Sequence, residues 1–272
     1  MKEFEKERKI IKRVQEHLIY LKEKGYEVVY IVLQGSQNYK LDIYDDEYMS
    51  DVDTKAVILP SFDDFVRNKA PISTTLILEN NEHIDVKDIR VMFDTYKKQN
   101  INYIETLFTK YKIINVKYMD LVQPIFDHNE EIAYININQA LRCMAGMSME
   151  KLKAMEHPYP TTKDKIEKYG YDPKQLHHIV RMNDFIRNYV SGKKYAECLV
   201  PKDEVKNFLL DIKTGKYDLE SARTIATLFD KNTKYIKDIN LLEKDEINQN
   251  AIEILEKVKF DILKKRFREE LK

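Results

Sequence analysis

Two aspartates placed two positions apart are the residues of this sequence best suited to chemistry. Asp51, Val52 and Asp53 stand at the head of an apolar segment, residues 51–59, whose pattern predicts a β-strand. Side chains at positions i and i+2 of a strand share a face, so Asp51 and Asp53 are predicted to project together while Val52 turns into the core. Two neighbouring carboxylates repel each other unless a cation or a proton intervenes, and oxygen ligands of this kind suit Mg²⁺.

A glycine–serine pair lies upstream, where another predicted strand ends. Residues 27–34 form a short, β-branched, apolar run, and Gly35 and Ser36 follow it before a predicted helical turn. Glycine lets the backbone approach a ligand closely, and serine adds a hydroxyl beside free helical N–H groups, which suits an anion. Each pair alone is also typical of an ordinary solvated turn or strand end. Their order along the chain is more specific and predicts a phosphate cradle beside a metal-binding pair.

A third carboxylate is expected from residues 82–89, which also have the pattern of a strand. Asp85 lies between the apolar residues Ile84 and Val86, so a rigid sheet would present its side chain on the opposite face from theirs. Asp88 is expected to cap the helix that follows, which is a structural role.

Residues 33–59 resemble the signature of the DNA polymerase beta nucleotidyltransferase superfamily, a Gly-Ser pair followed by Asp-x-Asp. The closer resemblance is to the predicted nucleotidyltransferases of bacteria and phages, including those associated with RNA ligases, whose pattern runs GSxxYGL, SDxD and later GYDxKxxxHxxR. This chain has GSQNYKL, SDVD and, at residues 169–182, YGYDPKQLHHIVRM. The resemblance covers roughly residues 30–195. Lys40 stands where that family usually has glycine, and the loop between Leu41 and Ser50 is longer and more acidic.

The resemblance implies a mechanism in which a nucleoside monophosphate passes from an NTP, such as ATP, to an acceptor hydroxyl and pyrophosphate leaves. Asp51 and Asp53 would hold two Mg²⁺ (or Mn²⁺) ions and the triphosphate. Asp85 would be the third metal-binding acid and the general base toward the attacking hydroxyl. Gly35 and Ser36 would hold the β- and γ-phosphates. An RNA or tRNA end, a protein side chain and a small molecule all fit as acceptor.

The second element of the resemblance is a predicted helix that begins at Asp172 and Pro173, an N-cap residue followed by proline at the first helical position. Lys174, His178 and Arg181 fall on one face of this helix, and its apolar stripe lies opposite. The row is predicted to point away from the packed side of the helix and to bind nucleotide phosphates. A solvated charged face is the ordinary alternative.

Other residues with chemical potential are assigned structural roles or stay open. His177 lies beside the row but nearer the core boundary, so it is interpreted as structural. Tyr171 suits base stacking and simple packing equally. Cys143 and Cys198 lack metal-ligand spacing and are interpreted as packing residues. The acidic stretch 45–47 is interpreted as a solvated loop.

These residues must be positioned by a fold that the wider sequence outlines. Strand patterns occur at 27–34, 51–59, 73–79, 82–89 and 112–116, while residues 2–24 and most of the chain after 124 have helical periodicity. We predict an α/β (α+β) fold with two domains. The first, residues 1–128, is a nucleotidyltransferase core with a mixed β-sheet, and the second, residues 129–272, is an all-helical C-terminal domain that contributes the basic helix.

The composition excludes some classes of protein. The 272 residues carry 46 Lys+Arg and 46 Asp+Glu, and this zero formal charge excludes a strongly basic chain that coats nucleic acid by bulk charge. No apolar run approaches the ~20 residues of a membrane span, and the first residues lack the apolar stretch of a signal peptide. A cytoplasmic protein without membrane contact is expected, and its oligomeric state is open.

Two other functions remain compatible with the sequence. One is a catalytically inactive, nucleotide-binding regulatory protein that keeps the transferase fold. The other is a component of a defence or toxin–antitoxin system.

Overall fold

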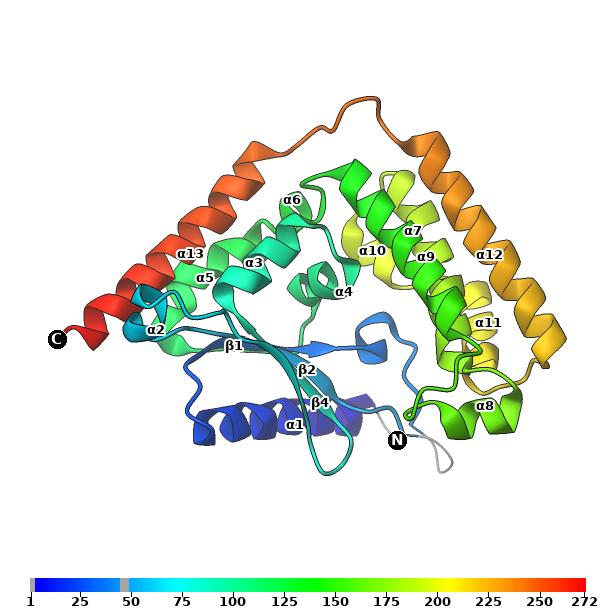
Figure 1. Cartoon of the computed structure of the whole chain (residues 1–272), viewed down its shortest axis with the longest axis horizontal. Coiled ribbons are helices and arrows are strands. Elements are labelled where there is room, and N and C mark those ends of the chain that lie inside the picture. The colour runs from blue at the N-terminus through cyan, green and yellow to red at the C-terminus, as the bar shows by residue number, and fades with distance from the viewer. Residues whose placement is uncertain (1–2, 45–48) are drawn as a thin grey trace. The chain divides into compact units, whose positions relative to one another are not determined.

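The computed structural model describes residues 3–44 and 49–272 and divides them into two compact units. The described residues up to Ile135, together with Asn248–Lys272, form the first unit, and Asn136–Ile247 form the second. The sequence prediction separates the domains at 128/129 and leaves the C-terminal segment with the helical part. In the structure this last segment belongs to the first unit, because its helix packs on helices beside the sheet. The fold is mixed α/β with a helical C-terminal part, and each unit is described by itself (Figure 1).

The first unit is built around a five-stranded mixed sheet. Its strands have the order β3-β4-β2-β1-β5. The β2–β4 pair is parallel and the other three pairs are antiparallel. The strands all fall within the segments that the sequence predicts: β1 Val28–Gln34, β2 Asp53–Ile58, β3 Ser73–Ile77, β4 His83–Asp88 and β5 Lys112–Ile114.

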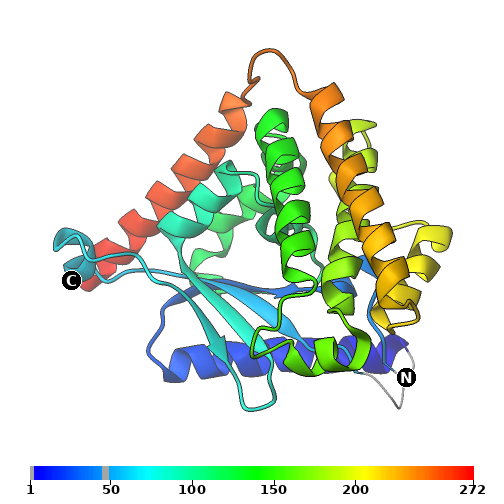
Figure 2. The ribbon, with the colours of Figure 1, turned by 45° about the vertical axis from the view of Figure 1, so that its right-hand side comes forward.

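Helices cover both faces of this sheet (Figures 1 and 2). Helix α1 runs along one face, and helices α3, α5 and α13 lie on the other side. Short helical segments connect these elements. The helical elements of the first unit are α1 Glu3–Glu23, η1 Ser36–Tyr39, α2 Phe62–Val66, α3 Ile89–Lys97, α4 Ile101–Ile104, η2 Glu105–Phe108, η3 Val116–Tyr118, α5 Met119–Asp127, α6 Asn129–Ala133 and α13 Gln249–Glu270.

A hydrophobic core between α1 and the sheet fixes which strand residues face which side. Val52 is 1% exposed and packs in this core, which confirms that it turns inward. The residues that alternate with the core positions of β2 and β4 therefore face the opposite, α3-covered side. The core members from α1, β2 and β4 are Ile10, Val14, Leu21, Ala56, Ile58, Ile84 and Val86.

The second unit is a bundle of helices around α9. Helix α9 packs against four of its neighbours, α7, α10, α11 and α12, so most of its surface is covered. Its start follows the sequence prediction, since the Asp172 side chain accepts a hydrogen bond from the Lys174 backbone N–H at 3.0 Å and Pro173 is the first helical residue. The helices are α7 Ile137–Ala154, α8 Lys163–Tyr169, α9 Pro173–Val190, α10 Tyr195–Leu199, α11 Asp203–Lys213 and α12 Leu219–Asn240.

Candidate functional site

The sheet register brings the Gly-Ser turn next to the aspartate pair. Gln34, the last residue of β1, pairs with Asp53, the first residue of β2, and the Gly-Ser turn follows Gln34 directly. A side chain of the turn also contacts the aspartate segment, because Gln37 Nε2 donates to the Asp51 carbonyl oxygen at 2.6 Å. The two motifs are therefore adjacent in space as well as in sequence.

The backbone of the turn requires the glycine that the sequence supplies. Gly35 has φ 114° and ψ −166°, a region that only glycine enters without strain. The helical turn η1 ends at Lys40, which has the left-handed conformation φ 59°, ψ 33°. A residue with a side chain is strained in this conformation, which glycine would adopt freely.

The Asp51–Asp53 segment is held by two consecutive residues, Glu82 just before β4 and His83 at its start. Glu82 accepts a hydrogen bond from the Val52 N–H at 3.3 Å. The backbone N–H of His83 donates to Asp53 Oδ1 at 2.8 Å, and the His83 ring nitrogen Nδ1 lies 3.2 Å from the same oxygen. The strand β2 begins at Asp53, so Asp51 precedes it and is not a strand residue, in contrast to the sequence prediction. Asp51 is exposed, and the Asp53 side chain is 28% exposed, so both acids are accessible.

Behind this clamp lies a buried polar network that sequence reasoning missed. His17 of α1 contacts Glu82 Oε2 through Nε2 at 3.0 Å and the Thr54 hydroxyl through Nδ1 at 2.9 Å. Arg13 Nε donates to the same Glu82 oxygen at 2.8 Å. Burial by itself would raise the pKa of Glu82, but the hydrogen bonds of His17 and Arg13 outweigh it and lower the pKa to about 2. No local sequence signal links α1 to residue 82.

Asp85 lies on the same face of the sheet, but it already has partners. The parallel register sets Asp85 opposite Lys55, and Lys55 Nζ lies 3.0 Å from Asp85 Oδ2. The Tyr103 hydroxyl of α4 donates to that oxygen at 2.9 Å, and Lys87 Nζ is 3.5 Å from Oδ1. Burial would raise the pKa of Asp85, but the ammonium of Lys55, the Tyr103 hydrogen bond and Lys87 together lower it.

The two groups of acids differ in how well they fit a metal ion. Asp51 is exposed and Asp53 is partly exposed, and their carboxylates are of the kind that Mg²⁺ prefers together with substrate phosphates, although Asp53 Oδ1 already accepts from the His83 N–H. Asp85 fits less well, because an ammonium and a phenol occupy one of its oxygens. Over residues 3–44 and 49–272, no group of three or more His, Cys, Asp or Glu side chains is arranged to hold a metal ion.

The predicted basic row of α9 lies in the second unit. Lys174 is exposed and His178 is half-buried, but Arg181 is only 4% exposed. The prediction that the row points away from packed neighbours therefore holds for Lys174 and not for Arg181, because α9 is surrounded by other helices. Burial first, and then the charge of Arg181, lower the pKa of His178 well below its usual value.

Neighbours of the row have structural positions. His177 is 5% exposed, and burial together with Arg181 and other cations lowers its pKa to about 3, so it is neutral at pH 7. Its Nε2 has no hydrogen-bond partner among the residues that the structure describes. Tyr171 is fully buried and its hydroxyl donates to the Tyr217 carbonyl at 2.9 Å, which favours packing over base stacking.

The remaining sequence candidates give no further site. Cys198 is buried and Cys143 is half-buried, and both are free thiols. The acidic stretch 45–47 lies outside the described residues. Asp88 caps α3 through a hydrogen bond from the Arg90 N–H at 2.9 Å, as the sequence predicts.

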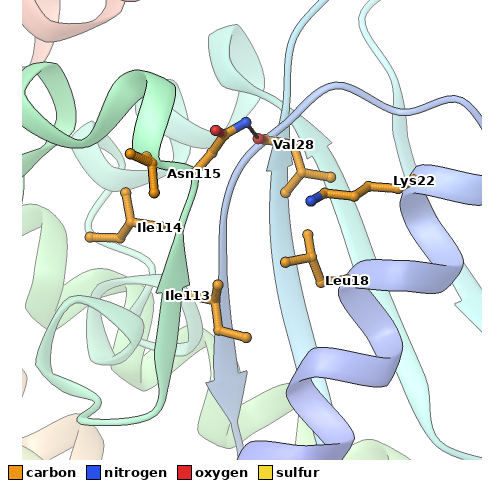
Figure 3. Close-up of a pocket in the computed structure, with 7 residues that line it drawn as sticks. Leu18, Lys22, Val28, Ile113, Ile114 and Asn115 are labelled. Atoms are coloured by element: carbon orange, nitrogen blue, oxygen red, sulfur yellow. Dashed lines mark hydrogen bonds between the residues drawn. The ribbon is translucent and has the colours of Figure 1, made fainter.

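A pocket between α1 and the β5 edge of the sheet lies away from these acids (Figure 3). It sits beside Val28, at the opposite end of β1 from the Gly-Ser turn. Its walls are mainly aliphatic, and the Asn115 side chain closes one side by donating to the Val28 carbonyl at 3.0 Å. The lining residues are Leu18, Lys22, Val28, Ile113, Ile114, Asn115 and Val116.

No protein-family model and no curated protein matches this chain. Within the described residues, no helix combines the length and the apolar character needed to cross a membrane.

Proposed function

We propose that this protein is a metal-dependent nucleotidyltransferase that transfers a nucleoside monophosphate from an NTP to an acceptor hydroxyl. One observation carries the proposal. The β1–β2 and β2–β4 registers bring the Gly-Ser turn, the Asp51–Asp53 pair and Asp85 to neighbouring strands of one sheet. Carboxylates beside a backbone turn that suits phosphate are the arrangement that phosphoryl transfer needs, because its catalysis is mostly positioning and charge neutralisation.

In this proposal Asp51 and Asp53 bind the divalent cation, and Gly35 and Ser36 bind the triphosphate. A bound Mg²⁺ would supply charge neutralisation at the phosphates. Gln37, which donates to the Asp51 carbonyl, keeps the turn and the acids in register. The two-residue clamp on Val52 and Asp53 fixes the direction in which the acids project.

The basic row of α9 is assigned to nucleotide phosphates as a separate part of the proposal. Lys174, His178 and Arg181 belong to the second unit, and their assignment follows from the sequence resemblance and from the cationic character of α9. We expect Arg181→Ala to raise the dissociation constant of the NTP. Because Arg181 is buried, the variant must first show an unchanged thermal unfolding temperature. A folded variant with wild-type nucleotide affinity by calorimetry would remove the row from the proposal.

The decisive experiment is a screen of α-³²P-labelled NTPs with Mg²⁺ or Mn²⁺ against RNA, tRNA, protein and small-molecule acceptors. We expect label transfer by the wild-type chain. Loss of a cation ligand costs several kcal/mol of transition-state stabilisation, so Asp53→Ala should lose about a thousandfold or more in rate. Asp51→Ala should behave alike. Asp120→Asn, at an exposed acid of the same unit, is the matched control and should keep full activity. Wild-type rates in Asp51→Ala would refute the metal role.

A nucleotide-binding regulatory protein is the alternative that the same sheet allows. It would bind NTP with Mg²⁺ but release no pyrophosphate with any acceptor in the screen. A component of a defence system would instead retain a partner protein through purification, and the partner would be identified by mass spectrometry.

A further inference from the structure

Asp85 is held in a closed arrangement of side chains on the face of the sheet opposite α1. Its Oδ2 receives both Lys55 Nζ, at 3.0 Å, and the Tyr103 hydroxyl, at 2.9 Å. Lys87 Nζ lies 3.5 Å from Oδ1 and donates to the Ser73 hydroxyl at 2.8 Å. These partners come from β2, β4, β3 and α4, so several elements fix the carboxylate.

Lys55 is unusual for a lysine because it is buried. Its relative exposure is 4%, and its ammonium lies 4.0 Å from the centroid of the Tyr103 ring. A buried cation is stable only when it is paired, so Lys55 and Asp85 depend on each other. The cation–π contact adds to this fixation. Burial lowers the pKa of Lys55 from its ordinary value, and the 3.0 Å contact with the Asp85 carboxylate opposes that shift and holds the ammonium on this face of the sheet.

The local charges leave little attraction for a divalent cation at Asp85. One carboxylate is accompanied by two ammonium groups, Lys55 and Lys87, which gives a local charge of about +1. Glu105 also acts on Lys55, and including its carboxylate brings the sum to about zero. A second divalent ion at Asp85 would have to displace the Lys55 ammonium from this carboxylate.

We propose that the Lys55–Asp85 ion pair takes the place of a second metal ion, so that the site binds one divalent cation through Asp51 and Asp53 while Lys55 is a fixed cationic positioning group. The inference rests on the proposed nucleotidyltransferase function for its substrate. The number of bound cations, however, can be measured without any turnover.

The test is a titration of the full chain with Mn²⁺, alone and with α,β-methylene-ATP, in which electron paramagnetic resonance counts the bound ions. We expect one Mn²⁺ per chain for the wild type. Lys55→Met should gain a second Mn²⁺ at Asp85, and Lys55→Met/Asp85→Asn should return to one. Lys55→Arg keeps the charge and should also bind one. Lys257→Ala, at an exposed lysine of α13 in the same unit, is the matched control with an expected count of one.

The outcomes separate this inference from the proposed function. Two ions in the wild type would overturn the inference and leave the transferase proposal standing. A count of one in a Lys55→Met chain that melts cooperatively would also overturn it. If no variant with intact Asp51 and Asp53 binds Mn²⁺ under either condition, the proposed function fails together with the inference. The double variant shows whether a second ion gained by Lys55→Met is bound at Asp85.

Discussion

In the first unit, the buried carboxylate of Glu82 and the half-buried carboxylate of Asp85 each have a basic side chain within hydrogen-bonding distance. In the second unit, helix α9 places His177 and His178 among cations instead. Burial and the charge of Arg181 lower the pKa of both histidines. Burial in the first unit thus brings carboxylates together with basic partners, whereas burial on α9 favours neutral histidines.

The two units also differ in the residues that occupy left-handed backbone conformations. Among the described residues, every non-glycine residue with positive φ lies in the first unit, and the positive-φ residues of the second unit are all glycines. Left-handed backbone costs about 1–2 kcal/mol for a residue with a side chain. The first unit therefore stores more local strain, part of it at Lys40 in the turn beside the candidate site.

The largest effect should come from removing the charge balance of the first unit. Glu82→Ala leaves Arg13, His17 and the Val52 N–H without their shared acceptor. Breaking a buried, hydrogen-bonded ion pair from one side costs about 3–5 kcal/mol of unfolding free energy. Urea denaturation measures it, and Glu253→Gln on the exposed side of α13 is the control. A loss below about 1 kcal/mol would show that the network is not stabilising.

The next effect tests the glycine backbone of the second unit. Gly215 has φ 72°, and a Cβ there would lie 2.4 Å from Tyr169 Cε1. Gly215→Ala should cost about 2 kcal/mol or more through strain and crowding. Gly146→Ala in α7 is the matched control, since a Cβ there meets nothing within 4 Å and alanine favours helices by roughly 0.5–1 kcal/mol. Equal unfolding free energies for the two variants would contradict the interpretation.

A smaller effect concerns the pH dependence of the second unit. The native pKa of His177 is about 3, below its usual 6.5, so the unfolded chain takes up the proton first. The contribution of His177 to the unfolding free energy is therefore fully present above pH 6.5. It falls by about 1.4 kcal/mol per pH unit as pH drops from 6.5 toward 3. His178 shifts in the same direction. Hydrogen exchange of α9 between pH 7 and 5 measures the slope.

His177→Gln should flatten this slope, and His157→Gln, at an exposed histidine of the same unit, should not. Glu82 provides the contrast within the first unit. Because the pKa of Glu82 is about 2, its contribution to the unfolding free energy is lost only as pH falls from 4.5 toward 2. Acidification to pH 5 should thus weaken protection of α9 before that of the sheet. Loss of protection in the sheet before α9 would contradict this difference between the units.

The smallest expected effect is a gain in the free energy of unfolding. Lys40→Gly should relieve the left-handed strain, partly offset by the greater freedom of glycine in the unfolded chain, for a net gain of about 0.5–1 kcal/mol. Lys40→Ala keeps the strain and should show no gain. Thermal unfolding of the two variants gives the answer directly.

The sequence by itself determined the local structure around the candidate site. The β-branched run before Gly35 forms β1, and the i, i+2 spacing sends Val52 inward while Asp53 faces the other way. Asp172 and Pro173 start α9 as their cap and N1 preferences require. These features depend on residues a few positions apart, so propensity and periodicity suffice to predict them.

Only the tertiary structure decided which distant residues meet. The parallel pairing of β2 with β4 sets Lys55 against Asp85, 30 positions away, and the packing of α1 brings His17 to Glu82. A hint was present, because Lys55 follows Asp53 by two positions and shares its face, but no local rule names its partner. The burial of Arg181 is also decided by tertiary structure. Four helices pack around α9, and the periodicity of the α9 sequence contains no information about them.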